Sequence, residues 1–207
     1  MTLTSPVMRH STTRKAVAFT FDDGPNPEFT PQILEIFREA NGKATFYMIG
    51  EQIERFPDTA RAVLEQGHEI GNHTYTHPDL TKLDEEARRS ELLRSERIIL
   101  ETTGVKPATF RPPYFAFDEQ AAATVAEFGY PVIGAVNGAA RDWEMPGVDH
   151  IVETTRETVE PGTILIFHDG FGDRSQTVEA VRQLVRELTS EGYELVTISE
   201  LLQSDQV

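Results

Sequence analysis

The sequence predicts a single α/β domain built on a parallel sheet, and three observations lead to this fold class. Short apolar runs alternate with longer amphipathic stretches, which is the pattern of strands and helices that follow one another along a chain. The 207 residues fit one domain, because no Pro/Ser-rich linker, repeat or low-complexity segment divides them. Polar motifs follow the ends of several apolar runs, where parallel sheets carry their active sites. The alternation alone leaves open whether the sheet is open or closed into a barrel.

Each strand is predicted from a short apolar run with turn residues nearby, and each helix from an amphipathic stretch between two such runs. The predicted strands are, in chain order, 16–21, 44–50, 68–72, 109–114, 130–136, 163–168 and 193–198. The predicted helices are 31–40, 84–103, 118–128, 149–159 and 175–190.

Composition limits the classes of partner. A hydrophobic share of 39% suffices for a sizeable core, since a domain of this size buries roughly 70% of the surface that its unfolded chain exposes. The formal net charge of −15 argues against nucleic acid or an anionic membrane as a partner. There is no cysteine, so a metal ion would be held by histidine and carboxylate. Residues 1–15 lack the apolar core of a signal peptide and no later stretch reaches transmembrane length, so we expect neither a signal peptide nor membrane insertion.

The most informative stretch is Thr-Phe-Asp-Asp-Gly-Pro at residues 20–25, which ends the first apolar run. Placing Asp22 beside Asp23 is costly unless a metal ion or a cation balances the two charges. Carboxylates paired in this way often divide the work, one as a ligand and the other as a base. The same residues also make a good capped turn, so both interpretations stay open at this point.

A second motif, His-Thr-Tyr-Thr-His, places His73 and His77 four residues apart. On a helical turn this spacing puts both imidazoles on one face, within reach of one metal ion. No glutamate lies between them, so a general base has to come from elsewhere, and the Asp22-Asp23 pair can supply both a base and a ligand. Two histidines and one carboxylate leave coordination positions open for water and substrate, as in a catalytic site.

With both motifs in view, the chain resembles the polysaccharide deacetylases, carbohydrate esterase family 4, also known as the NodB homology domain. Five motifs occur in the order and approximate spacing of that family: Asp22-Asp23, His73 to His77, Arg111 to Tyr114, Asp142-Trp143 and Ile166 to His168. The resemblance extends from about residue 16 to residue 202. It implies a distorted (β/α) barrel of about seven parallel strands. We therefore expect residues 1–15 to form a flexible tail and residues 16–203 to form the catalytic domain.

The resemblance also implies a catalytic role for five residues. Asp22 would be the general base, and Arg111 would keep it ionised and oriented. The backbone N–H of Tyr114 would help to stabilise the tetrahedral oxyanion. His168 would protonate the departing group, and Asp142 would hold its tautomer and raise its basicity. Taken by position alone, His168 would be a core histidine, whereas a surface ion pair is the less favoured alternative for Arg111.

The same resemblance implies the metal and the substrate pocket. Zinc is the ion we expect first, with cobalt or another divalent transition metal as the alternative. We expect the substrate pocket to include Pro113, Trp143 and Ile166, although a lone tryptophan is more often part of a core. The metal ligands would be Asp23, His73 and His77.

Three residues depart from the family pattern. Phe115 follows Tyr114 where a glycine is usual, which puts the shape of the substrate in doubt more than the chemistry. Ala139 stands where the fourth motif often begins with an aspartate. Ile166 replaces a leucine of similar volume, a change that should matter little.

The function implied is hydrolysis of N-acetyl groups on β-1,4-linked N-acetylglucosamine glycans, with chitin oligosaccharides ahead of peptidoglycan. The alternatives are an O-acetyl xylan esterase on the same fold, a small-molecule amidohydrolase, and a glycan-binding protein without activity. The retained acid and base weigh against the last of these. We expect a monomer that acts on an acetylated glycan in the cell envelope or outside the cell. The absence of a signal peptide leaves a cytoplasmic location open.

Overall fold

The computed structural model describes residues 5–203. Its strands are β1 (Ala16–Asp22), β2 (Thr45–Met48), β3 (Glu69–Asn72), β4 (Thr163–His168) and β5 (Glu194–Leu195). Its helices are α1 (Phe29–Glu39), α2 (Gly50–Arg55), α3 (Pro57–Glu65), α4 (Glu85–Thr103), α5 (Glu119–Glu127), α6 (Val148–Arg156), α7 (Ser175–Ser190) and α8 (Ile198–Gln203). Short 3₁₀ turns are η1 (Leu80–Lys82), η2 (Pro113–Phe115), η3 (Gly138–Ala140) and η4 (Asp142–Glu144).

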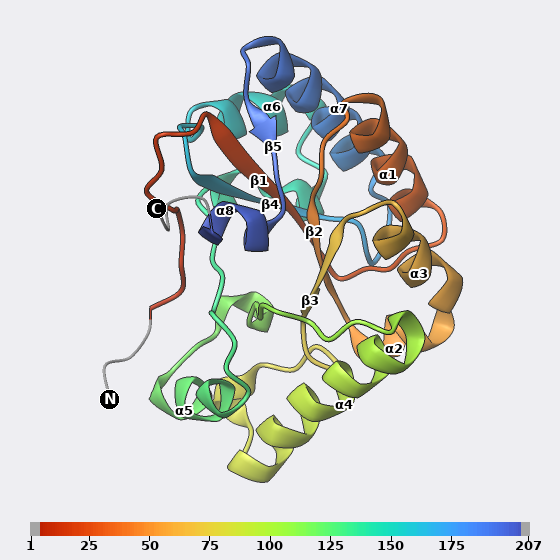
Figure 1. Cartoon of the computed structure of the whole chain (residues 1–207), viewed down its shortest axis with the longest axis vertical. Coiled ribbons are helices and arrows are strands. Elements are labelled where there is room, and N and C mark those ends of the chain that lie inside the picture. The colour runs from red at the N-terminus through yellow and green to blue at the C-terminus, as the bar shows by residue number, and fades with distance from the viewer. Residues whose placement is uncertain (1–4, 204–207) are drawn as a thin grey trace.

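The five strands form one parallel sheet in which β1 is central (Figure 1). The order is β3-β2-β1-β4, and the short β5 pairs with the first residues of β1. The pairing of β1 with β4 runs from Val17 opposite Thr163 to Asp22 opposite His168. This register places Asp22 and His168 side by side at the carboxyl ends of two adjacent strands. The predicted fold class, an α/β domain on a parallel sheet, is confirmed.

The alternation of side chains along β1 decides which of them face the site. Successive residues of a strand point to opposite faces of the sheet. Phe19 and Phe21 belong to the large core cluster that α1, α3, α6 and α7 complete. Ala18 belongs to a second cluster on the other face of the sheet. Thr20 and Asp22 share that second face, which we call the inner face.

β4 repeats this pattern in register with β1. Leu165 and Phe167 join the large core cluster, and the Phe167 ring stacks on Phe19 with centroids 5.7 Å apart. Ile164 and Ile166 belong to the cluster on the inner face. His168 therefore projects from the inner face as well, beside Asp22.

The sheet is less regular beyond β3. The runs 109–114 and 130–136, predicted as strands, form isolated bridges instead. The bridges join Asn72 with Phe110, Phe110 with Val132 and Val7 with Ile133. Beyond them the N–H of Val136 donates to the oxygen of Ile164 in β4, over 3.1 Å. The regular strands of the described chain thus form an open sheet of five, not about seven, and single bridges continue it from β3 round to β4. Prolines, which lack the N–H that a ladder needs, interrupt both runs: Pro112, Pro113 and Pro131.

Helices surround the sheet on its outside (Figure 1). The five predicted helices are present, with ends within three residues of those predicted. α4, the longest, begins where the Asp84 side chain accepts a hydrogen bond from the N–H of Ala87, and it ends at Gly104, whose φ of 76° suits glycine. The sequence analysis missed α2 and α3, six and nine residues long, and also α8. Helices this short give little periodicity to recognise.

Part of the predicted flexible tail lies against the body of the molecule. Residues 1–4 lie outside the described residues. Within 5–15, Val7 bridges to Ile133, and the N–H of His10 donates to the oxygen of Gly162 over 2.9 Å. The division of the chain at residue 16 stays a prediction.

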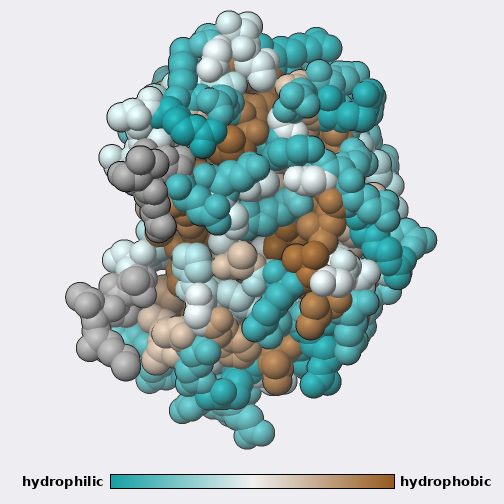
Figure 2. All heavy atoms as spheres, viewed as in Figure 1, coloured by the Kyte–Doolittle hydropathy of each residue, from teal (hydrophilic) through white to brown (hydrophobic). Residues whose placement is uncertain are grey.

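Much of the molecular surface is polar. Figure 2 shows one face on which hydrophilic residues predominate, with hydrophobic residues gathered in patches between them. This matches the high charge of the sequence. No helix among residues 5–203 has both the length and the apolar character that a membrane span needs.

Candidate active site

Asp22, the last residue of β1, is held by a fully buried arginine. One terminal nitrogen of Arg111 donates to Asp22 Oδ1 over 2.7 Å and to Thr20 Oγ1 over 2.6 Å. Its other nitrogens donate to the backbone oxygens of Ile133, over 3.2 Å, and Gly134, over 2.8 Å. Every nitrogen of the guanidinium therefore has a partner, and the arginine cannot turn away from the carboxylate. The Asp22 to Arg111 pair expected from the family motifs is present.

Asp23, His73 and His77 come together beside this pair. Their candidate ligand atoms all lie within 4.8 Å of one another. Asp23 Oδ1 lies 3.1 Å from Nε2 of His77 and 3.6 Å from Nε2 of His73. These three residues form a possible metal site, from an acid and two imidazoles.

The chemistry of Asp23 fits a bound cation. Its Oδ1 is buried and has no hydrogen-bond partner among the described residues, which is costly for a charged oxygen unless a cation lies there. Burial by itself would raise the pKa of this carboxyl, but the neighbouring imidazoles of His73 and His77 outweigh it and hold the pKa well below its usual range. Asp23 is therefore an anion, as a ligand has to be.

The two histidines do not lie on a helix, and that part of the prediction is wrong. They lie in the loop that follows β3, where His77 has a left-handed backbone with φ of 64°. Nδ1 of His73 lies 2.8 Å from the backbone oxygen of Arg111 and donates to it. Nε2 then carries no proton, and its lone pair is available for a metal ion on the side of Asp23. The conformation of this loop, not a helical turn, therefore brings the two imidazoles together.

His168, at the end of β4, is oriented by Asp142. Nδ1 of His168 lies 2.8 Å from Asp142 Oδ1, and its backbone N–H donates to Oδ2 over the same distance. Thr177 Oγ1 also donates to Asp142 Oδ2, over 3.0 Å. Burial would lower the pKa of His168, but the charge and hydrogen bond of Asp142 outweigh it and raise that pKa to about 9. Nε2 is then a protonated donor at neutral pH.

These groups surround one cavity of about 660 Å³. Ile166 and Trp143 line it, as predicted, but Pro112 does so in place of the predicted Pro113, which is buried. Aromatic rings are exposed at its rim, with 71% of Tyr114 accessible and 43% of Trp143. A second cavity, of about 610 Å³, lies at the opposite end of β1 and contains none of the motif residues.

Besides Pro112, four residues that were given no role from the sequence also line the main cavity: Phe115, Gly138, Phe171 and Arg174. Phe115 was noted as a departure in the third motif. Phe171 and Arg174 follow His168 in the loop after β4. The signal that would have found them is their position, since the loops after the strands of a parallel sheet form its active site.

A buried acid lies below the Asp22-Asp23 turn. Asp169 Oδ1 has no hydrogen-bond partner among the described residues, and a Cβ added to Gly24 would meet it at 2.6 Å. Thr30 donates to the other oxygen. Burial raises the pKa of Asp169 to about 7 against the hydrogen bond of Thr30, which lowers it. The close contact explains a glycine at position 24, because a side chain there would displace the carboxyl group.

Comparisons with known proteins agree with this site. The family model of the polysaccharide deacetylases matches residues 9–133. A peptidoglycan-N-acetylglucosamine deacetylase of Bacillus cereus is 40% identical over 189 residues, which cover 91% of this chain and 88% of the relative. A chitooligosaccharide deacetylase of a Bradyrhizobium species is 34% identical over 201 residues and covers 90% of each chain.

The fold has solved counterparts as well. The crystal structure of the Bc1960 peptidoglycan N-acetylglucosamine deacetylase superposes with a TM-score of 0.90 and 31% identity. The match covers 96% of this chain and 93% of that one. The family model, the relatives and the geometry of the five motifs agree, and the chain belongs to the polysaccharide deacetylase family.

Proposed function

We propose that this protein is a metal-dependent hydrolase that removes N-acetyl groups from β-1,4-linked N-acetylglucosamine glycans. The observation that carries the proposal is the register of β1 with β4, which sets Asp22 beside His168 next to the Asp23, His73 and His77 cluster. Each of the two proton-transfer residues has its own partner that fixes its orientation. A site with both a base and an acid suits hydrolysis, whereas a glycan-binding protein needs neither.

Asp22 acts as the general base. Arg111 occupies its Oδ1, so Oδ2 takes the proton from the attacking water. Oδ2 lies 3.7 Å from Nε2 of His73, at the edge of the ligand cluster. The guanidinium holds the Asp22 carboxylate in place and prevents it from rotating into the ligand position of Asp23.

Asp23, His73 and His77 would hold the metal, for which zinc is proposed and cobalt is the alternative. Bound there, it would make water more acidic and polarise the acetyl carbonyl. The backbone N–H of Tyr114 is proposed as the second stabiliser of the oxyanion. Tyr114 has φ of 58°, a left-handed conformation that is unusual for a bulky residue and is often found at functional sites.

His168 acts as the general acid. Its Nδ1 donates to Asp142, so Nε2 carries the proton that goes to the leaving nitrogen. An amide needs this step more than an ester does, because an alkyl amide anion cannot leave without a proton. The raised pKa of about 9 keeps the imidazole protonated over the neutral range.

The substrate class rests on the relatives and on the cavity. The similar proteins are named for action on peptidoglycan and on chitooligosaccharides, both of which carry N-acetylglucosamine. The exposed rings of Tyr114 and Trp143 suit the flat apolar faces of sugar rings. We propose that Ile166 lines the pocket for the acetyl methyl group. A substrate of this kind places the protein in the cell envelope or outside the cell, and we propose that it acts there as a monomer.

Mass spectrometry of acetylated glycans tests this function. Chitotetraose, peptidoglycan fragments and acetylated xylan are incubated with the protein, with and without a chelator. We expect the N-acetylated glycans to lose 42 mass units for each acetyl group removed. The chelator should abolish this loss, and zinc or cobalt should restore it. Deacetylation of xylan alone would support the esterase alternative. Full activity in metal-free protein would contradict the proposed mechanism.

A further inference from the structure

Arg174 is the one arginine or lysine among the described residues that line the cavity. It lies in the loop after β4, directly before the first residue of α7. Only 7% of it is exposed. The lining of the cavity also includes Trp143, Ile166 and Phe171, together with the carboxylates of Asp22 and Asp23. A buried cation in such a wall needs a physical explanation, since an uncompensated charge is costly to bury.

The partners of Arg174 are all neutral. Its Nε donates to the backbone oxygen of Gly170 over 2.8 Å. One terminal nitrogen, Nη1, donates to the backbone oxygens of Trp143 and Asp173, each over 3.3 Å. An arginine has five N–H donors, so both donors of the other terminal nitrogen, Nη2, are left without a partner in the part of the chain described here. No carboxylate forms an ion pair with it there either.

Comparison with the other buried arginines sharpens this point. Arg88 and Arg111 are the other two arginines that are buried in the described structure. Arg88 uses Nε and both terminal nitrogens on oxygens of Thr124, Leu83 and Gln120. Arg111 does the same and also pairs with a carboxylate. Arg174 alone leaves a terminal nitrogen without a partner, and that nitrogen is not among the fully buried orphan atoms. Nη2 is therefore accessible.

The position of Arg174 also works against its charge. The amino-terminal end of a helix carries a partial positive charge, which disfavours a cation there. Three backbone oxygens offset part of this cost, yet they would serve a neutral glutamine almost as well. An anionic group that enters the cavity would complete the coordination of the guanidinium and balance its charge.

We propose that Nη2 of Arg174 binds a carboxylate on the glycan, close to the sugar that loses its acetyl group. The guanidinium is planar, and its paired N–H groups match the two oxygens of a carboxylate. Trp143 connects this site to the acid, because its ring lies 5.1 Å from that of His168 while Arg174 holds its backbone oxygen. The carboxylate would therefore lie on the side of the cavity where the amine departs.

This inference rests on the proposed function and narrows its substrate class. Chitin oligosaccharides are neutral and offer nothing to Arg174. A glycan with lactyl ether groups offers a carboxylate on the neighbouring sugar, and one with peptide stems offers a carboxylate farther away. Both sources share the same chemistry, so the structure favours acidic glycans of the peptidoglycan type over chitin.

A matched pair of substrates tests the proposal. One tetrasaccharide of alternating N-acetylglucosamine and N-acetylmuramic acid carries free lactyl carboxylates, and the other carries them as neutral methylamides. A third glycan, with an alanine on each lactyl group, moves the carboxylate outward. We expect the wild-type protein to prefer a carboxylate glycan over the methylamide by about ten- to a hundredfold in kcat/KM, the range of charge-assisted hydrogen bonds. The glycan with the larger kcat/KM, lactyl or alanyl, identifies the source.

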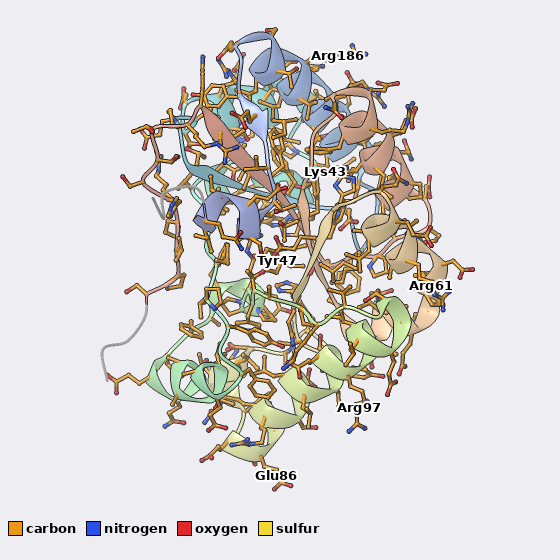
Figure 3. The ribbon with its side chains drawn as sticks, in the orientation of Figure 1. Lys43, Tyr47, Arg61, Glu86, Arg97 and Arg186 are labelled. Carbon is orange, nitrogen blue, oxygen red and sulfur yellow. The ribbon has the colours of Figure 1, made fainter. Side chains whose placement is uncertain are left out.

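Variants separate recognition from support of the loop. Arg174→Gln should remove the preference while the methylamide glycan is turned over within about threefold of wild type. Arg174→Lys keeps the charge but loses the planar fork, so part of the preference should remain. The matched control is Arg186→Gln, the same change on α7 at the periphery of the molecule (Figure 3), and it should leave the preference intact. Equal losses on both glycans in Arg174→Gln would mean that this residue only supports the Trp143 loop, and would overturn the proposal.

Binding measurements separate this proposal from the proposed function. In Asp22→Asn, whose turnover should be slower by at least about a hundredfold, calorimetry gives the dissociation constants of the carboxylate and methylamide glycans. Tighter binding of the carboxylate glycan without acetate release by wild type would uphold the role of Arg174 and contradict the proposed function. Acetate release with equal affinities and equal kcat/KM for the two glycans would uphold the proposed function and contradict the role of Arg174.

Discussion

The part of the molecule with regular strands, which we call the regular half, and the segment 105–147, which has no regular strand and which we call the irregular half, contribute different kinds of residue to the site. β1, β3 and β4 end in the groups that would do the chemistry: Asp22, Asp23, His73 and His168. The irregular segment 105–147 supplies the groups that orient them, since Arg111 holds Asp22 and Asp142 holds His168. Arg111 also accepts a hydrogen bond from His73 through its backbone oxygen. The comparison teaches that the proposed base and acid lie at the ends of paired strands, whereas the side chains that orient them come from the irregular segment.

Loss of a metal ligand from the regular half should have the largest effect. His73→Ala removes one of the three residues in the ligand cluster, so both metal content and activity should be lost. Metal analysis of the purified variant, with glycan turnover measured in parallel, checks this. His68→Ala, whose imidazole lies in the core between Phe37 and Phe46, is a control for the loss of a buried histidine and should keep its metal. A fully loaded His73→Ala protein would contradict the assignment.

Loss of the base should come next. Asp22→Asn keeps the shape of the side chain and the hydrogen bond from Arg111 but cannot take a proton, so the metal should remain while kcat falls by about 10²- to 10⁴-fold. Metal analysis together with initial rates on chitotetraose measures both. A variant with nearly wild-type kcat would place the base elsewhere.

Loss of the acid should depend on the leaving group. His168→Ala should reduce kcat/KM for an N-acetylated glycan by about 10²- to 10⁴-fold, but for a nitrophenyl acetate by less than about tenfold, because a phenoxide leaves without a proton. The two rates are compared in the same preparation. Equal losses on both substrates would assign His168 to structure or to oxyanion binding.

The smallest effect is expected from the irregular half. Asp142→Asn should reduce kcat/KM by about 10- to 100-fold, because it affects only the orientation and basicity of His168. The pH profile should also change. The acid has to be protonated, so wild-type kcat/KM should fall as pH rises through about 9, and without the Asp142 charge the pKa of His168 drops and this fall moves to lower pH. An unchanged profile would show that Asp142 does not set the pKa of the acid.

The same pair makes a prediction about stability. The pKa of His168 is raised from 6.5 to about 9 on folding, so its contribution to the free energy of unfolding is complete below pH 6.5 and is lost as pH rises to about 9. Thermal unfolding at pH 6 and pH 9.5 should therefore show a smaller decrease in Tm for Asp142→Asn than for wild type. Identical decreases would contradict a coupled pair.

The sequence predicted the regular half of the fold better than the irregular half. The apolar runs at β1 and β4 are unbroken and lie between clear turns, so periodicity and composition identify them. The runs at 109–114 and 130–136 contain prolines, and the single bridges that they form depend on tertiary contacts that no local pattern contains.

Within the site, the motifs and the family resemblance together predicted residues that the structure brings close to one another, including the pairs Asp22 with Arg111 and Asp142 with His168. They were not enough to find the conformation of the loops. The His73 to His77 spacing suggested a helical turn, whereas residues with left-handed backbone conformations in a loop bring the two imidazole rings equally close together. Phe171 and Arg174 escaped notice because a loop rich in Gly and Asp has a sufficient local explanation as a turn. Their approach to the cavity depends on how that loop folds back toward Trp143.

The central place of β1 makes the assembly of this site a late event in folding. β1 pairs with β4 through contacts such as that of Thr20 with Leu165, 145 residues apart in sequence. Closing a loop of that length has a large entropic cost, and chains rich in such contacts fold slowly. During synthesis the residues of the metal cluster emerge first, within the first 77 positions, while the acid and β4 follow much later. The growing chain can therefore present ligand side chains long before it has a complete active site.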